Sequence, residues 1–88
     1  MIVEKFFEDK VKILYERFAE KGRMLPTGVA YINSWITEDV KVCYQLMEAE
    51  NEAQLHAWIA NWSDVASFEI FAVISSAQAK EKVFANNF

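Results

Sequence analysis

The chain has almost no residues that interrupt regular secondary structure. Its single proline and both of its glycines fall within one stretch, Gly22 to Gly28. Glycine and proline are the strongest local signals of turns and loops. We therefore predict one domain over residues 1–88, in which one elaborate loop joins a helix to a hairpin.

Cysteine, histidine and long apolar runs are scarce as well. The lone Cys43 excludes a disulfide within the chain and suits a reducing compartment, so we expect a cytoplasmic protein. One histidine and one cysteine do not supply a set of metal ligands, and we predict no metal site. No apolar run approaches the roughly 20 residues of a membrane span. The first residues also lack the apolar core of a signal peptide.

Positive charge is limited and scattered. The net charge is −4, with nine Lys and Arg among thirteen Asp and Glu. Nucleic acids and anionic membranes bind basic stripes, so we expect neither as a partner. Apolar bulk, in contrast, is abundant at 53% of residues, with 15% aromatic. Either the core is unusually aromatic or a second subunit covers part of this surface, and we favour the second interpretation.

The first helix is predicted from apolar residues that recur at helical spacing between Val11 and Phe18. Asp9 is placed to cap its beginning, and Gly22 is placed to end it. Two further helices are marked by pairs with the spacing of a capping box, Asn51 with Gln54 and Ser75 with Gln78. These helices are predicted over residues 52–62 and 76–85. Strands are predicted over residues 2–7, 29–36, 41–48 and 67–74.

The predicted order of elements is β-α-β-β-α-β-α. It corresponds to the split βαβ of ferredoxin-like α+β folds, with an additional C-terminal helix. We expect a four-stranded antiparallel sheet with helices on one face. The other sheet face must then be polar or be covered by something else.

The turn of the hairpin decides which residues share a sheet face. If Thr37 pairs with Val40, one face combines large rings with polar tips, as a ligand cavity or a subunit interface does. We expect this face to lie away from the helices, although a slip of one residue would exchange the two faces. It carries Val29, Tyr31, Asn33, Trp35, Val42, Tyr44, Leu46 and Glu48.

The predicted ligand-binding residues are the polar and aromatic members of that face together with one loop cation. They are Tyr31, Asn33, Trp35, Tyr44, Glu48 and Arg23. Arg23 follows the helix-ending glycine, where it either holds an anion over the sheet or caps helix carbonyls.

Three carboxylates lie inside predicted strands, where acidic residues are depleted: Glu4, Glu48 and Glu69. Any of them on the buried sheet face would need a partner or a raised pKa, which is how catalytic carboxylates arise. Edge positions and salt bridges between subunits explain the same pattern. As candidates for a catalytic base we select Glu48 and Glu69. The lone Cys43 is expected to be a buried small side chain rather than a nucleophile.

Several short motifs together resemble a known family. They are Gly22-Arg23-Met24-Leu25-Pro26, Asn33-Ser34-Trp35, Cys43-Tyr44-Gln45-Leu46-Met47-Glu48, Trp58-Ile59, Trp62-Ser63-Asp64 and Phe68-Glu69. The chain is similar in these motifs to a small bacterial family of domains of unknown function grouped with the dimeric α/β-barrel superfamily. The resemblance implies a homodimer in which two ferredoxin-like subunits pack sheet against sheet.

The same superfamily includes cofactor-free quinol-type monooxygenases, haem-degrading enzymes and proteins similar to muconolactone isomerase. No catalytic motif of these relatives can be placed on this chain, so the resemblance does not transfer an activity. We expect a domain that binds a small molecule without a cofactor in a cavity on the sheet face away from the helices. The alternative is a cofactor-free monooxygenase or isomerase that acts on a small aromatic or quinol-like substrate.

Overall fold

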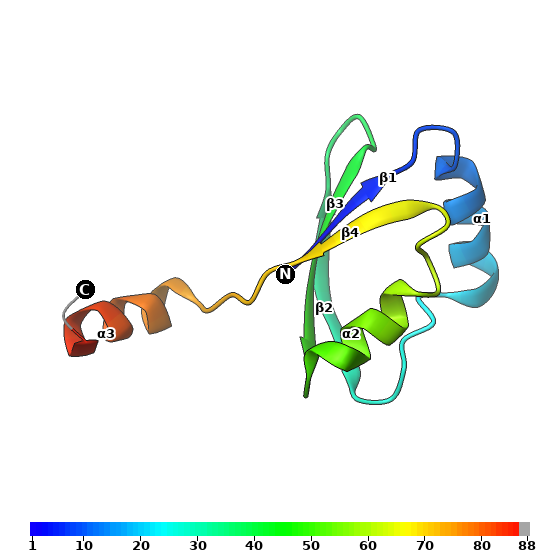
Figure 1. The fold of residues 1–88 in the computed structure, drawn as a ribbon. Helices are drawn as coiled ribbons and strands as arrows, with labels where there is room; N and C mark the ends of the chain where they lie inside the picture. The colour runs from blue at the N-terminus through cyan, green and yellow to red at the C-terminus, as the bar shows by residue number, and fades with distance from the viewer. Residues whose placement is uncertain (87–88) are drawn as a thin grey trace.

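The structure, a computed structural model, describes residues 1–86. Its elements follow the predicted order (Figure 1). They are β1 (Ile2–Phe6), α1 (Val11–Lys21), β2 (Val29–Ile36), β3 (Val42–Ala49), α2 (Glu52–Ile59), β4 (Ala66–Ile70) and α3 (Ser76–Asn86).

The four strands form one antiparallel sheet in the order β2-β3-β1-β4. Helices α1 and α2 both cover the same face of this sheet, and α3 lies apart from it (Figure 1). This arrangement confirms the ferredoxin-like α+β fold that the sequence predicts.

The core lies between the sheet and the two covering helices. Trp58 of α2 and Trp62 are almost fully buried, as predicted. The helix was predicted to continue to residue 62 but ends at Ile59, so Trp62 lies just beyond it. The Trp58 ring meets Phe68 of β4 edge to face at 5.5 Å. Ile2 of β1 is 1% exposed at the centre of the same cluster. The second helix therefore holds the sheet mainly through buried aromatic area.

The C-terminal end of α1 agrees with the prediction, and the N-terminal end does not. Gly22 ends the helix with φ +65°, and its N–H donates to the Phe18 carbonyl over 2.8 Å. The prediction that Asp9 caps the other end was wrong, because the helix begins one residue later than this cap requires. Lys10 is the N-cap residue, and its N–H donates to the Phe7 carbonyl. Asp9 thus lies exposed in the turn before the helix.

Both predicted capping pairs make the N-cap hydrogen bond, but only Ser75–Gln78 completes the box, because the Gln54 side chain accepts from the Glu50 N–H instead of the Asn51 N–H. The Asn51 side chain accepts a hydrogen bond from the Gln54 N–H at the start of α2. At the start of α3, Ser75 Oγ accepts from the Gln78 N–H while Gln78 Oε1 accepts from the Ser75 N–H. This reciprocal pair is a complete capping box, so the local sequence determines where α3 begins.

The hairpin register differs from the prediction. Thr37 donates its N–H to the Val42 carbonyl over 2.9 Å, so it lies opposite Val42 rather than Val40. The register shifts again by one residue between Tyr31 and Asn33, where β2 contains a bulge at Ile32. A bulge turns the strand over, so residues on its two sides that are predicted to share a face lie on opposite faces.

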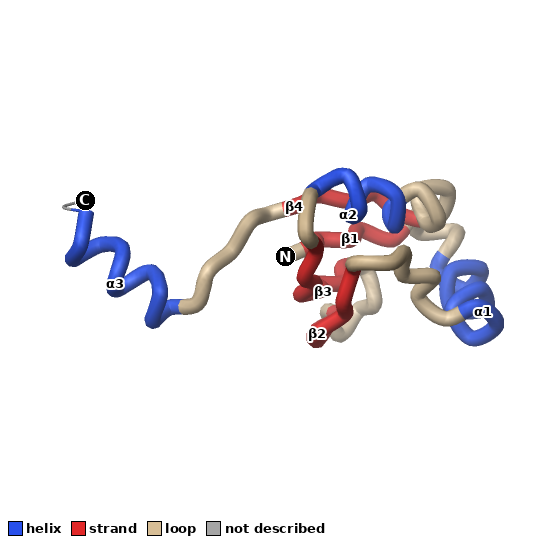
Figure 2. The backbone as a smooth tube through the Cα atoms, turned by 90° about the horizontal axis from the view of Figure 1, so that it is seen from below, coloured by secondary structure: helices blue, strands red, loops and turns tan. Residues whose placement is uncertain are grey.

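The last strand is shorter than predicted. β4 ends at Ile70, opposite Ile2 at the beginning of β1, and the predicted strand continued to Ile74. Beyond this point, the amine of Met1 donates a hydrogen bond to the Phe71 carbonyl, and the Met1 carbonyl accepts one from the Phe71 N–H. The chain then runs away from the sheet toward α3, as two perpendicular views show (Figure 1 and Figure 2).

Candidate functional site

A cavity of about 180 Å³ lies between α1 and the helix-covered face of the sheet. Tyr15, Phe18 and Ile36 line it and are themselves exposed, which places its mouth between α1 and the hairpin. Its wall combines aromatic rings with a few polar groups. The lining residues are Glu4, Phe6, Leu14, Tyr15, Phe18, Arg23, Ser34, Ile36, Cys43, Gln45, Trp58 and Trp62.

The most unusual group in this cavity is the carboxyl of Glu4. It projects from the middle of β1 onto the helix-covered face and is only 5% exposed. Gln45 of β3 donates its side-chain N–H to Glu4 Oε1 over 2.5 Å. Burial raises the pKa of Glu4 to about 7, against the opposing effects of the Gln45 hydrogen bond and the Arg23 charge. The carboxyl therefore exchanges a proton near neutral pH.

Arg23 is held at the cavity wall from two directions. Its backbone carbonyl accepts hydrogen bonds from the indole N–H groups of Trp58 and Trp62, at 2.9 and 3.0 Å. Its guanidinium lies 3.5 Å from the centre of the Tyr31 ring and 5.0 Å from that of Phe18. These cation–π contacts keep a positive charge at the wall of the cavity.

Cys43 is the cross-strand neighbour of Glu4 and lines the same cavity. Burial, and then the Glu4 charge, raise the pKa of its thiol to about 12, with Arg23 opposing. A thiol with this pKa is not a nucleophile near neutral pH. The prediction that Cys43 is buried is confirmed.

The predicted ligand-binding residues do not form one group. Asn33, Trp35, Tyr44 and Glu48 occupy the sheet face away from the helices, where Trp35 lies opposite Tyr44. Tyr31 lies on the helix-covered face, so its predicted placement beside them was wrong. The cause is the bulge, which sets Tyr31 opposite Met47 on the core side.

The cavity thus lies on the opposite side of the sheet from the predicted one. Of the predicted ligand-binding residues, Arg23 lines this cavity, and the Tyr31 ring stacks on the Arg23 guanidinium. Ser34, also in the lining, is bonded to the Tyr31 hydroxyl at 2.6 Å. The face away from the helices, which we call the open face, remains uncovered and exposes Trp35 and Tyr44.

The three strand carboxylates occupy different environments. Glu69 is exposed on the open face and lies 3.7 Å from Lys5. Glu48 is exposed opposite Ala30. Only Glu4 lies in the cavity, the situation in which sequence reasoning expects a raised pKa. The alternation of Ile2, Glu4 and Phe6 is the signal that could have selected it, because it places Glu4 on an apolar strand face.

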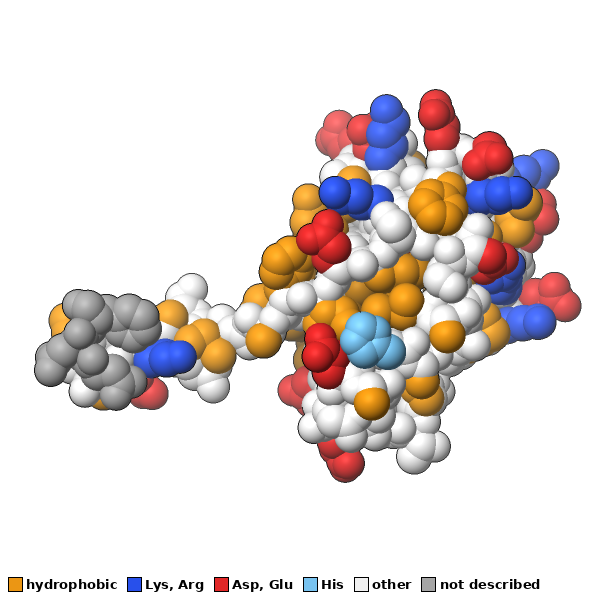
Figure 3. Space-filling view, viewed as in Figure 1, with side chains coloured by type: hydrophobic (Ala, Val, Ile, Leu, Met, Phe, Trp, Pro, Cys, Tyr) orange, Lys and Arg blue, Asp and Glu red, His pale blue; other side chains and the backbone are white. Residues whose placement is uncertain are grey.

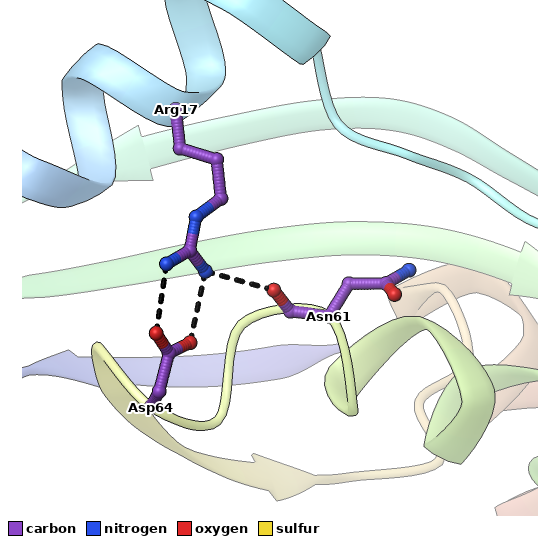
Figure 4. Close-up of polar contacts among 3 residues, drawn as sticks. All are labelled: Arg17, Asn61 and Asp64. Carbon is purple, nitrogen blue, oxygen red and sulfur yellow. Dashed lines mark hydrogen bonds and ion pairs between the residues drawn. The ribbon is translucent and has the colours of Figure 1, made fainter.

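One ion pair, between Arg17 and Asp64, joins α1 to the connection between α2 and β4 beside the cavity. Arg17 donates two parallel hydrogen bonds to the Asp64 carboxylate, at 2.8 and 2.7 Å, and a third to the Asn61 carbonyl (Figure 4). Its guanidinium also lies 5.6 Å from the centre of the Trp62 ring. The Arg17 hydrogen bonds hold the pKa of Asp64 down to about 2. The cavity roof is therefore tied to the connection between α2 and β4.

Fold and site together define a small ferredoxin-like α+β domain with one ionisable carboxyl in an aromatic cavity. The chain belongs to the family described as Domain of unknown function (DUF3303), whose model matches residues 1–86. Comparison with curated proteins and with solved structures gave no match. Among residues 1–86, no helix is both long and apolar enough to cross a membrane. The same residues contain no group of three or more His, Cys, Asp or Glu side chains that could hold a metal ion.

Proposed function

We propose that this domain binds a small, largely apolar molecule in the cavity between α1 and the sheet. The observation that carries the proposal is the buried Glu4 carboxyl among aromatic side chains. Gln45 occupies Oε1, and within the described residues no hydrogen bond is made by Oε2. A polar atom left available in an apolar pocket is typical of a group that orients a ligand.

The size of the cavity limits the ligand to about one ring. An engineered apolar cavity of about 150 Å³ holds benzene, and this cavity measures about 180 Å³. Its walls include the rings of Phe6, Tyr15 and Phe18, with two tryptophans behind them. Flat faces of this kind favour an aromatic or similarly planar molecule.

The polar groups indicate what the ring carries. Protonated Glu4 donates a hydrogen bond, and its ionised form accepts one, so a hydroxyl on the ligand suits both states. Arg23 stabilises negative charge at the same wall, as its effect on the Glu4 pKa indicates. A phenol or quinol therefore fits better than a cation, which would lie beside the guanidinium.

Calorimetric titration with phenol and hydroquinone tests this proposal. We expect saturable binding to the natural chain and at least tenfold weaker binding to Glu4→Leu, which removes the carboxyl. Glu69→Leu is the matched control, because that carboxylate is exposed on the open face. Absence of saturable binding, or equal effects of the two substitutions, would contradict the proposal.

Catalysis by Glu4 is the second candidate function. A carboxylate whose pKa lies near 7 is well matched to proton removal near neutral pH. In a quinol-like substrate it would take the proton of the ring hydroxyl, while Arg23 stabilises the resulting oxyanion. This is the cofactor-free monooxygenase or isomerase alternative, with Glu4 rather than Glu48 or Glu69 as the base.

Aerobic turnover of hydroquinone and catechol separates catalysis from binding alone. Glu4→Gln should abolish turnover, while Glu48→Gln and Glu69→Gln should retain it. The opposite result would favour the carboxylates selected from the sequence. Binding without turnover would leave the binding function as the better description.

Association into a homodimer through the open faces also belongs to the proposal. It is supported by the exposure of large rings on a sheet face that no helix covers, with Trp35 53% and Tyr44 42% exposed. Sedimentation equilibrium should give a dimer at micromolar concentration, and Trp35→Asp should weaken it. A monomer at that concentration would contradict this part of the proposal.

A further inference from the structure

The last described part of the chain, residues 71–86, packs little against the residues before it. We call this part the C-terminal arm. It consists of the extended segment 71–75 followed by α3. Hydrophobic side chains follow one another along this segment outside the domain (Figure 3). The exposed large apolar side chains of the arm are Phe71, Val73, Ile74, Val83 and Phe84.

Helix α3 needs a packing surface. It has 11 residues, and isolated helices shorter than about 12–15 residues are marginal in water. The Ser75–Gln78 capping box specifies where the helix begins but adds only about 1 kcal/mol. Phe84, the most exposed large apolar residue of the described chain at 75%, marks the side that a partner would cover.

The stem of the arm directs it away from its own domain. Two backbone hydrogen bonds between Met1 and Phe71, at 2.7 and 2.8 Å, continue the line of β4 past the beginning of β1. Residues 71–75 contain neither glycine nor proline, and Val73 and Ile74 are β-branched, which favours an extended chain. The segment contains one residue that favours turns, Ser75, and its side chain already caps α3, so nothing in it favours a reversal that would return α3 to its own domain.

A groove able to receive such an arm lies at the same end of the molecule. It measures about 1200 Å³ and runs between the stem of the arm, the open end of the β2–β3 hairpin and the start of α2. Ile32, Leu46 and Leu55 provide apolar wall. The groove also carries three acidic residues, Glu48, Glu50 and Glu52. Helix α3 carries Lys80 and Lys82, which are complementary to these acidic residues, with one acidic residue, Glu81, between them.

We propose that the C-terminal arm of one copy lies in this groove of a second copy, and that the second copy returns the same contact. The inference rests on the proposed homodimer and specifies its second contact besides the open faces. A two-fold axis makes the exchange reciprocal and closed. An arm and a groove from each copy then enter one interface, consistent with the about 20–30 residues a side of stable complexes.

Isotope-filtered NMR on the full chain tests where the arm lies. In an equal mixture of ¹³C-labelled and unlabelled protein, we expect contacts between copies from Val83 and Phe84 to the methyl groups of Ile32 and Leu46. Contacts within one copy only would mean that the arm folds back. Absence of any arm contact would mean that it is free. Either result overturns the inference.

Association measurements provide a second, independent test. Phe84→Asp should weaken dimerisation at least tenfold in sedimentation equilibrium, because it places a charge in the groove. Phe7→Asp is the matched control, since Phe7 is exposed in the turn after β1, outside both the arm and the groove. A dimer weakened by Trp35→Asp but not by Phe84→Asp would overturn arm exchange while leaving the open-face dimer intact.

Discussion

The burial of Glu4 makes the stability of the domain depend on pH in an unusual direction. Its pKa rises from the ordinary value of 4.5 to about 7 on folding. Between these values the folded state holds a proton that the unfolded state has released, so the free energy of unfolding falls as pH rises. At 1.36 kcal/mol for each pH unit, the whole effect is about 3 kcal/mol, of which about 2 kcal/mol appears between pH 5 and pH 7.

Urea denaturation at pH 5, 6 and 7 measures this loss. Glu4→Gln should remove it, because glutamine has no proton to release and still offers an oxygen to Gln45. All other titrating groups are shared by the two proteins, so they cancel in the difference. Glu69→Gln should keep the loss of the natural chain. Equal pH dependence of the natural chain and Glu4→Gln would refute the account of Glu4, as would a ¹³C-detected carboxyl titration near pH 4.5.

Two further predictions concern the framework of the site. Gly28→Ala should lower the free energy of unfolding by about 2 kcal/mol in urea denaturation, because alanine is strained at φ +90° and its Cβ would displace the Gln54 side-chain amide, which accepts a hydrogen bond from the Glu50 N–H. Gly22→Ala, with open space at φ +65°, should lower it by only about 1 kcal/mol, and the reverse order would contradict this. Arg17→Lys should raise the pKa of Asp64 toward its ordinary value, measured by carboxyl NMR, because lysine cannot make the paired hydrogen bonds. The ion pair stabilises the fold above about pH 4, and this stabilisation is lost as the pH falls toward 2 and Asp64 is protonated. Arg17→Lys should therefore make the free energy of unfolding depend less on pH in this acidic range.

The fold could be predicted because local signals agree with one another. Apolar spacing marks α1 and α2, and the capping residues Asn51 and Ser75 mark where α2 and α3 begin. These signals act over a few residues, so one sequence is enough to find them. The order of the seven elements then leaves few arrangements other than the ferredoxin-like sheet.

The hairpin register could not be predicted because it depends on side-chain bonds in the turn. Thr37 Oγ1 accepts from the Val42 N–H, and Asp39 Oδ1 accepts from the Lys41 N–H. They stabilise a longer loop in which Val40 takes φ +56°, a conformation that a β-branched residue rarely adopts.

The bulge at Ile32 has no counterpart in the apolar pattern. Asn33 accepts the N–H of Ser34 beside it through its side chain, and so satisfies a backbone donor next to the interrupted ladder. The bulge divides the predicted group of ligand-binding residues between two sheet faces. It also explains why Tyr31 stacks on Arg23 instead of joining Trp35.

The sequence identifies Glu4 as a carboxylate inside a strand, but it does not distinguish Glu4 from Glu48 and Glu69 as the functional one. The requirement for a partner or a raised pKa applies to any carboxylate on the buried face. The alternation of Ile2, Glu4 and Phe6 favours that face for Glu4, but Val3 and Phe7 on the other face are apolar too, so the structure is needed to decide between the faces. Gln45, the partner of Glu4, lies between Cys43 and Met47 on the same side of β3. A polar residue between two buried ones carries no separate sequence signal, since it becomes informative only when the cross-strand neighbour is known.

The three tryptophan indole N–H signals provide the most direct test of the central claim that ligand binds between α1 and the sheet. Trp58 and Trp62 line this cavity, whereas Trp35 lies on the open face. Titration with phenol, followed by ¹H–¹⁵N NMR, should shift the Trp58 and Trp62 signals in a saturable way and leave the Trp35 signal unchanged. A saturable shift of Trp35 alone would place the ligand on the open face and contradict the account.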